Sequence, residues 1–142
     1  MKIYLASPFT GKWWWQRWYR VYVATKSAAR LKKDGYMVFS PLTHSFFCAL
    51  FMPHRFMCNH DFWMAQDLPF VEFCDCVIVL SDNNKWRQSR GVCTEVSRNC
   101  AINHPFFVFS PDQIKDGCYK QILRDSGKYL YLDCTINKGC EL

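Results

Sequence analysis

The sequence predicts an α/β fold, in which one domain forms a three-layer sandwich with a mostly parallel, five-stranded sheet of Rossmann-like or flavodoxin-like type. Short β-rich runs alternate along the chain with longer segments of helical periodicity. The best-defined strand, Cys76–Leu80 (CVIVL), is apolar throughout, as expected for a strand covered on both faces. The 142 residues, 50% of them hydrophobic, suffice for one core and show no repeat or linker. We therefore treat residues 1–142 as a single domain.

The first half of the chain is expected to supply two strands and one long helix. Gly35 ends the apolar helical pattern, and Pro53 interrupts the apolar segment that follows the second strand. The expected elements are a strand over Lys2–Ala6, a loop over 7–11, a helix over Trp14–Lys33, a strand over 36–39, a turn over 40–44, and a broken helix or packed loop over 45–60.

The second half continues the alternation of strands and helices. Pro105 stops one helical pattern, whereas Pro69 lies inside another that we still expect to be helical. The expected elements are a helix over 61–73 that Asp61 caps, the strand Cys76–Leu80, a polar loop over 81–89, a helix over 91–102, a strand over Phe106–Phe109, a helix over 112–125 and a strand over 129–132.

Composition narrows the class of protein. The net charge of +6 suits an anionic ligand such as a nucleotide but is also common without one. No signal peptide or apolar run of about 20 residues is visible, so we expect a cytoplasmic protein without a membrane partner. The nine scattered cysteines are expected to be reduced thiols. A zinc site could be drawn from Cys48, His54, Cys58 and His60, but the spacing fits no common pattern, and we expect no metal and no cofactor.

The chemistry should lie where the carboxyl ends of the strands lead into loops and helices. Three stretches meet this condition: residues 7–11, the surroundings of Asp67, and residues 84–95. The last contains SRGVCTE, in which Ser89 and the free N–H groups of a helix start form a natural anion site. The local pattern alone favours a simpler interpretation, in which Ser89 only caps the helix and Glu95 is a surface acid that interacts with the helix dipole.

The motifs IYLASPF, FSPLTHS, HDFW, CD-x-VIVL and W-x-x-S-x-GV-x-x-E occur in that order. Together they resemble the nucleoside 2-deoxyribosyltransferase superfamily over residues 2 to about 109. The S-x-G-V-x-x-E form is closer to the 2′-deoxynucleoside 5′-phosphate N-hydrolase branch than to the transferases, which have an aspartate where Ser89 stands. The pattern is also similar to small, uncharacterised phage and bacterial proteins, so the cytoplasm could be that of a phage host.

The resemblance implies a role for each matching residue. Glu95 matches the nucleophile that forms a covalent ribosyl intermediate, Asp67 the acid that assists the leaving base or holds the sugar, and Tyr4 the tyrosine that positions the nucleophile. Ser89 matches the serine that binds the 5′-phosphate. The other expected binding residues are Ser7, Pro8, Phe9, Arg90 and Gly91, and those expected to border the pocket are His44, His60, Trp63, Trp86 and Arg87. The first loop departs from the glycine-rich loop of the hydrolase branch, because it reads SPFTGK here.

The segment KWWWQRWYR, with its tryptophans from Trp13 to Trp18, has several interpretations. A subunit contact or a lid is favoured, because members of the superfamily assemble as oligomers whose sites border a neighbour. Core packing and binding to nucleic acid or lipid are the alternatives. We expect a homodimer or a larger oligomer, and no nucleic-acid partner.

Three functions remain open. The favoured one is an N-glycosidase, either a hydrolase or a 2-deoxyribosyl transferase, that cleaves the base–(deoxy)ribose bond of a nucleoside or nucleoside 5′-monophosphate. The others are a catalytically silent protein that binds or sequesters a nucleotide, and an oligomeric interaction protein. The joint presence of Tyr4, Asp67 and Glu95 favours the enzyme, because a decayed site usually loses a carboxylate.

Overall fold

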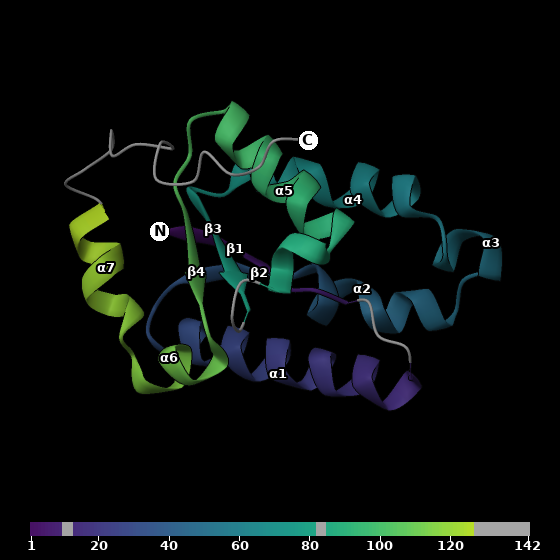
Figure 1. Ribbon diagram of the computed structural model, residues 1–142, viewed down its shortest axis with the longest axis horizontal. Helices are drawn as coiled ribbons and strands as arrows, with labels where there is room; N and C mark the ends of the chain where they lie inside the picture. The colour runs from purple at the N-terminus through teal and green to yellow at the C-terminus, as the bar shows by residue number, and fades with distance from the viewer. Residues whose placement is uncertain (10–12, 82–84, 127–142) are drawn as a thin grey trace.

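The computed structural model describes residues 1–9, 13–81 and 85–126, which form a three-layer α/β sandwich (Figure 1). Within them the sheet has four parallel strands in the order β2-β1-β3-β4. Their bounds are β1 Lys2–Ala6, β2 Met37–Phe39, β3 Cys76–Leu80 and β4 Phe106–Phe109. The α/β class and the parallel sheet are confirmed, with four strands instead of five. The fifth strand, expected over 129–132, lies outside the described residues, as do positions 10–12 and 82–84 of the two expected site loops.

The strand order creates a crevice at one point of the sheet edge. β1 and β3 are the central pair, in register from Ile3 opposite Cys76 to Ala6 opposite Val79. The chain leaves β1 toward β2 on one side, and leaves β3 toward β4 on the other. The loops after β1 and β3 therefore diverge, and such a switch point is where open α/β sheets bind ligands.

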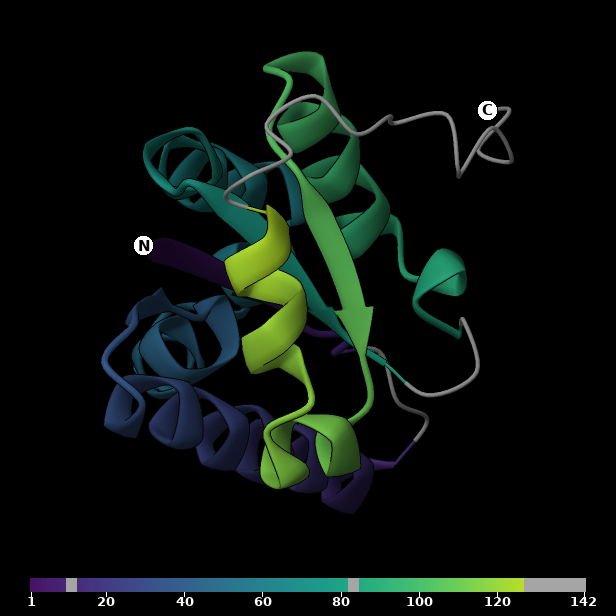
Figure 2. The same ribbon diagram turned by 90° about the vertical axis from the view of Figure 1, so that its left-hand side faces the viewer.

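Helices cover both faces of the sheet, as Figure 2 shows. On one face lie α1 (Trp14–Lys33), α6 (Pro111–Asp116) and α7 (Tyr119–Ser126), and on the other lie α4 (His60–Phe73) and α5 (Arg90–Ala101). Side chains of β1 alternate between the two cores: Ile3 and Leu5 face α1, whereas Tyr4 and Ala6 face α4 and α5. This alternation brings the Tyr4 hydroxyl beneath α5.

The segment between β2 and α4 is more helical than the sequence indicates. The turn expected over 40–44 is wrong, because Pro41 takes the first helical position of α2 (Pro41–Leu50), where its missing N–H costs nothing. A short helix α3 (His54–Met57) follows Pro53. The expected polar loop before α5 contains the 3-10 helix η1 (Lys85–Gln88).

Two other helix boundaries differ from expectation. Asn59, and not Asp61, caps α4, since its side-chain oxygen accepts a hydrogen bond from the Phe62 backbone N–H at 3.1 Å. The single helix expected over 112–125 is broken into α6 and α7 by Gly117, whose φ of 81° lies in the left-handed region.

Two expectations concern membrane-spanning segments and the state of the cysteines. No helix among the described residues has both the length and the apolarity of a membrane span. The seven described cysteines are free thiols.

Candidate functional site

Glu95 is placed by the periodicity of α5. Val92, Val96 and Asn99 form the buried face of this helix, and Glu95 falls on the same face. Its side chain is therefore buried, at 5% exposure, although it is acidic. The helix begins at Arg90, so Glu95 stands in its second turn.

The Tyr4 hydroxyl donates a hydrogen bond to Glu95 Oε1 at 2.7 Å. Tyr4 is fully buried in the sheet, so this bond fixes one carboxyl oxygen from below. The contact between Tyr4 and Glu95 that the sequence predicts is present. The other oxygen, Oε2, is buried and has no hydrogen-bond partner in the described part of the chain. A buried carboxyl oxygen without a partner costs stability, and such a group points to a functional role.

Asp67, on α4, supplies the second carboxyl group. It is 5% exposed, and burial raises its pKa to about 6. Its charge acts on Glu95, and both side chains line one cavity. The structure thus brings Tyr4, Asp67 and Glu95 to a single place.

Burial dominates the ionisation of Glu95. It raises the pKa of Glu95 to about 8; the hydrogen bond from Tyr4 lowers it, and the charge of Asp67 raises it. Desolvation therefore outweighs the hydrogen bond from Tyr4, which favours the charged form of Glu95. The pKa of Tyr4 is raised well above 10, first by burial and then by Glu95, so its hydroxyl remains a donor.

The cavity around Glu95, here called the glutamate pocket, has a volume of about 500 Å³. This is within the range of roughly 300–1,000 Å³ for small-molecule sites. Six of the residues expected to bind substrate or border the pocket line it: Ser7, Phe9, His60, Trp63, Ser89 and Gly91. Aromatic rings from α1 and α2 complete the wall, namely Trp14, Trp18 and Phe46.

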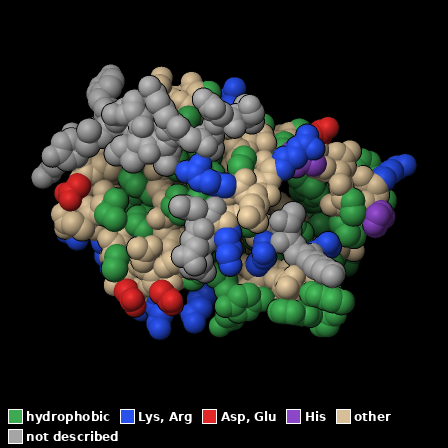
Figure 3. All heavy atoms as spheres, viewed as in Figure 1, with side chains coloured by type: hydrophobic (Ala, Val, Ile, Leu, Met, Phe, Trp, Pro, Cys, Tyr) green, Lys and Arg blue, Asp and Glu red, His purple; other side chains and the backbone are tan. Residues whose placement is uncertain are grey.

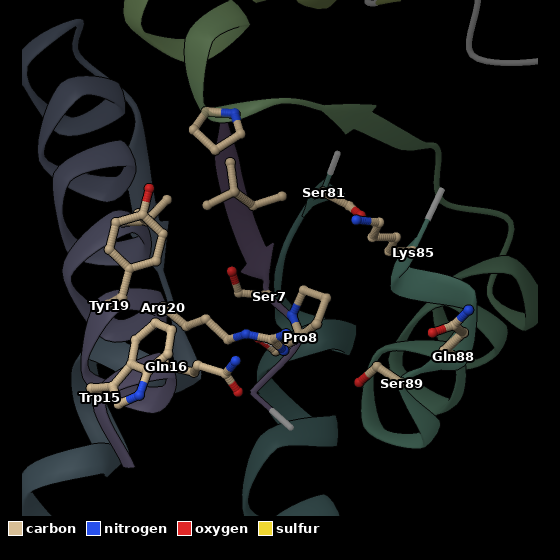
Figure 4. Close-up of a pocket in the computed structure, with 13 residues that line it drawn as sticks. Ser7, Pro8, Trp15, Gln16, Tyr19, Arg20, Ser81, Lys85, Gln88 and Ser89 are labelled. Atoms are coloured by element: carbon tan, nitrogen blue, oxygen red, sulfur yellow. The ribbon is translucent and has the colours of Figure 1, made fainter. Parts of the chain in front are cut away.

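A second cavity, here called the basic pocket, has a volume of about 470 Å³ and lies between α1 and η1 (Figure 4). Pro8, expected to bind substrate, lines this pocket. Ser7 and Ser89 line both pockets, so the two cavities meet at these serines. Arg20 and Lys85 are the cations of its wall.

Ser89 marks the start of α5 without capping it through its side chain. Its backbone oxygen accepts from the Cys93 N–H at 3.0 Å, but its hydroxyl makes no cap hydrogen bond. The side chain is buried at the junction of the two pockets instead. Its position therefore suits a ligand contact better than the purely structural alternative.

Four of the expected pocket residues line neither cavity. Arg90 is exposed at the first position of α5. His44 packs against the ring of Phe39. Trp86 is buried in the core beneath α5, and the Arg87 guanidinium lies over its ring, 4.8 Å from the centroid. These four side chains therefore contribute to neither the glutamate pocket nor the basic pocket. Packing against aromatic rings accounts for His44, Trp86 and Arg87, and an exposed helix position accounts for Arg90.

The sequence did not single out Lys85 as a site residue, nor Arg20 apart from its segment. Arg20 belongs to α1, while Lys85 lies in a polar stretch with no motif. Only the fold brings them to one cavity. In the described part of the chain, no three His, Cys, Asp or Glu side chains lie close enough to hold a metal ion, and this includes the zinc cluster considered from the sequence.

Comparison with known proteins identifies a family and a structural neighbour. The model of a family described as "Domain of unknown function (DUF1937)" matches residues 1–111. A search of curated proteins found no match. Among solved structures, a 2-deoxyribosyltransferase from the psychrotolerant bacterium Bacillus psychrosaccharolyticus, described as a biocatalyst for nucleoside synthesis, aligns with a TM-score of 0.54 and 25% identity over 78% of this chain and 73% of that chain. This likeness confirms the predicted nucleoside 2-deoxyribosyltransferase-like superfamily.

Proposed function

The chain belongs to the DUF1937 family, whose function is unknown, and we propose that it is an N-glycosidase that uses Glu95 as its nucleophile. The proposed substrate is a nucleoside or nucleoside 5′-monophosphate. The observation that carries the proposal is the buried Glu95 carboxyl, held by Tyr4 through one oxygen and unpartnered at the other, in a cavity of about 500 Å³. The likeness to a 2-deoxyribosyltransferase supports the same class of reaction.

In the proposed reaction, Glu95 Oε2 attacks the anomeric carbon of the sugar. The C–N bond to the base breaks as the new C–O bond forms, and the electron pair of the broken bond leaves with the base. Asp67 donates a proton to the departing base. Water, or a second base, then attacks the same carbon and gives up a proton to the Asp67 carboxylate. The C–O bond to Glu95 breaks and its electron pair returns to the Glu95 carboxylate; attack by water makes the enzyme a hydrolase, and attack by a second base makes it a transferase.

The two carboxyl groups hold one proton between about pH 6 and 8, the range between their pKa values. Their pKa values place that proton mostly on Glu95, so the reactive arrangement, with the proton on Asp67 and Glu95 ionised, is the minor one of the two. Below this range both groups are protonated and the nucleophile is lost; above it both are ionised and the acid is lost. We therefore infer a reaction that runs fastest near neutral pH.

The walls of the glutamate pocket suit the base and sugar. Phe9, Trp18, Phe46 and Trp63 offer aromatic faces on which a base can stack. Ser7 and Ser89 stand at the opening toward the basic pocket, which favours a substrate with a 5′-phosphate at that end. The serine at 89, where the transferases have aspartate, favours the hydrolase over the transferase.

A silent nucleotide-binding protein is the second candidate. One observation favours it: Glu95, with a pKa of about 8, is mostly protonated at pH 7. A neutral acid can donate a hydrogen bond to a ligand but cannot attack a sugar. The two functions differ in whether base is released.

We further propose that the chain self-associates through the exposed aromatic residues of α1. Core packing of the tryptophan segment is wrong, because Trp14 is 73% exposed and Trp18 is 43% exposed. Figure 3 shows hydrophobic side chains along the edge of the molecule formed by the first half of α1. This aromatic surface comprises Trp13, which precedes α1, and Trp14, Trp15, Tyr19 and Tyr22 of α1. Trp14 also lines the glutamate pocket, and Trp15 and Tyr19 also line the basic pocket.

The test incubates the protein with the four common deoxynucleosides and with their 5′-monophosphates, and measures the released base by chromatography. We expect wild-type protein to release base from at least one of them, and Glu95→Gln to lose several orders of magnitude of this activity. The matched control is Glu72→Gln, because Glu72 is an exposed glutamate that pairs with Arg98 and lines neither pocket. Near-wild-type release by Glu95→Gln would exclude the proposal, and tight binding without release by wild type would favour the silent protein.

A further inference from the structure

Of the site residues expected from the sequence, Ser7, Pro8 and Ser89 line the basic pocket, and its other lining residues were not expected there. The basic pocket adjoins the glutamate pocket at Ser7 and Ser89, so one extended ligand can occupy both. Figure 4 shows its walls: Gln16 and Arg20 come from α1, Lys85 and Gln88 come from η1, and Ser7 lies between them. The cleavage reaction proposed above uses none of the side chains that line this pocket alone.

The chemistry of the basic pocket is that of an anion site. Two cations and several hydroxyl and amide groups line it, and none of its described lining residues is acidic. The Arg20 guanidinium donates to the Pro8 carbonyl at 3.2 Å, which holds it against the loop after β1. No carboxylate in the described residues lies within salt-bridge distance of Arg20 or Lys85. Their charge is thus left for a ligand.

Position and size indicate more than one phosphate. The serines at the junction are the first polar groups that a 5′-substituent meets as it leaves the glutamate pocket. Arg20 and Lys85 line only the cavity beyond that junction. That cavity, at about 470 Å³, is as large as sites that hold whole small molecules. A single phosphate at the serines would leave most of it, and both cations, unused.

We propose that the basic pocket binds the phosphate chain of a nucleoside 5′-di- or triphosphate whose base and sugar occupy the glutamate pocket. This inference rests on the proposed function for the identity of the nucleoside part. The phosphate nearest the sugar contacts Ser7 and Ser89, and the later phosphates contact Arg20 and Lys85. The preferred substrates are therefore nucleotides with two or more phosphates.

Calorimetric titration of the full chain tests the proposal. The ligands are the four deoxynucleosides, their mono-, di- and triphosphates, and inorganic triphosphate alone. We expect affinity to rise from the nucleoside to the di- and triphosphates, and inorganic triphosphate to bind measurably. Lys85→Met should weaken the di- and triphosphates about 10- to 100-fold, the range for a lost charged hydrogen bond, and leave the nucleoside unchanged.

Two variants make the result specific. Arg87→Met is the matched control, since Arg87 is in the same 3-10 helix but lines neither pocket. Arg20→Gln keeps an N–H donor for the Pro8 carbonyl while removing the charge, so it should act like Lys85→Met without displacing the loop. Equal affinity for mono- and triphosphates, or equal effects of Lys85→Met and Arg87→Met, would overturn the proposal.

The outcomes separate the two proposals. If no ligand loses its base but the triphosphate preference and its dependence on Lys85 persist, the glycosidase is wrong and the phosphate site stands. If base is released from nucleosides and monophosphates, and longer chains bring no gain in affinity or rate, the phosphate site is wrong and the glycosidase stands.

Discussion

At the residue scale, the hydrogen bond between Tyr4 and Glu95 positions the proposed nucleophile, but burial of the Glu95 carboxyl lowers the stability of the fold. The buried Glu95 carboxyl has one hydrogen-bond donor and one orphaned oxygen. Desolvation of its charged form is what raises the pKa of Glu95 to about 8. A fold optimised only for stability would place an apolar residue at this point of α5. The proposed role of Glu95 as the nucleophile explains why a buried acid stands here in spite of this loss of stability.

The stability of the fold should depend on pH through Glu95. Between its ordinary pKa of 4.5 and its folded pKa of about 8, the folded chain retains a proton that the unfolded chain releases. The free energy of unfolding therefore falls as pH rises through this window, by about 1.4 kcal/mol per pKa unit at most. We expect Glu95→Gln to melt at a higher temperature than wild type at pH 8–9, and the difference to shrink toward pH 5. A constant difference across this range would contradict the assigned ionisation.

Tyr4→Phe should change the pH profile of the reaction. In wild type we expect a bell-shaped dependence of kcat/KM on pH, with limbs near 6 and 8 that belong to the carboxyl pair. Loss of the Tyr4 hydroxyl removes a hydrogen bond that lowers the pKa of Glu95. The upper limb should move to higher pH, and kcat/KM at pH 7 should fall by about 10- to 100-fold. An unchanged profile would mean that Tyr4 does not act on the nucleophile.

At the scale of the elements, apolar runs and helical spacing were sufficient to predict the bounds of several strands and of the longest helix. The bounds of β1, α1, β3 and β4 match those predicted from apolar runs and helical spacing, with the same end residues for α1. Prediction was wrong where one residue decides the outcome: Pro41 begins a helix instead of continuing a turn, and Gly117 breaks one. Both residue types are compatible with either role, and tertiary packing selects between them.

Gly117 provides the element-scale prediction. A Cβ at this position would make only ordinary contacts, the nearest at 3.7 Å to Lys120 Cε, so space is not the constraint. The constraint is the left-handed backbone, with φ of 81°. An alanine in this conformation should lower the free energy of unfolding by about 1–2 kcal/mol. Urea unfolding of Gly117→Ala should show this loss while base release per folded molecule stays unchanged. Gly117→Asn, which tolerates this conformation better, should lose less; equal stability of all three proteins would contradict the role of Gly117.

At the scale of the whole molecule, the sequence predicts the acids of the site better than its cations. Asp67 and Glu95 follow from motif order, and the strand alternation then places Tyr4 under Glu95. Arg20 and Lys85 could not be paired from the sequence, because they belong to distant segments and neither carries a pattern. The size of the two pockets and their connection depend on how α1, η1 and the loop after β1 are placed relative to one another. Local sequence patterns do not predict this placement.

The aromatic surface on α1 supplies a prediction about assembly. Tyr22 is 60% exposed and lines neither pocket, so its change should leave the site intact. We expect light scattering at micromolar concentration to give a dimer or larger for wild type and a smaller species for Tyr22→Glu. Ile122→Glu is the control, because Ile122 is exposed on α7, which lies at the opposite end of the molecule from the first half of α1 (Figure 1). A wild-type monomer would refute self-association.

The covalent intermediate is the central claim, and mass spectrometry of the acid-quenched reaction tests it most directly. During turnover of a substrate that releases base, the account predicts a protein species heavier by one glycosyl group, with the added mass on the peptide that contains Glu95. The species should disappear in Glu95→Gln and persist in Glu72→Gln. Base release with no adduct in wild type, or an adduct on another residue, would contradict Glu95 as the nucleophile.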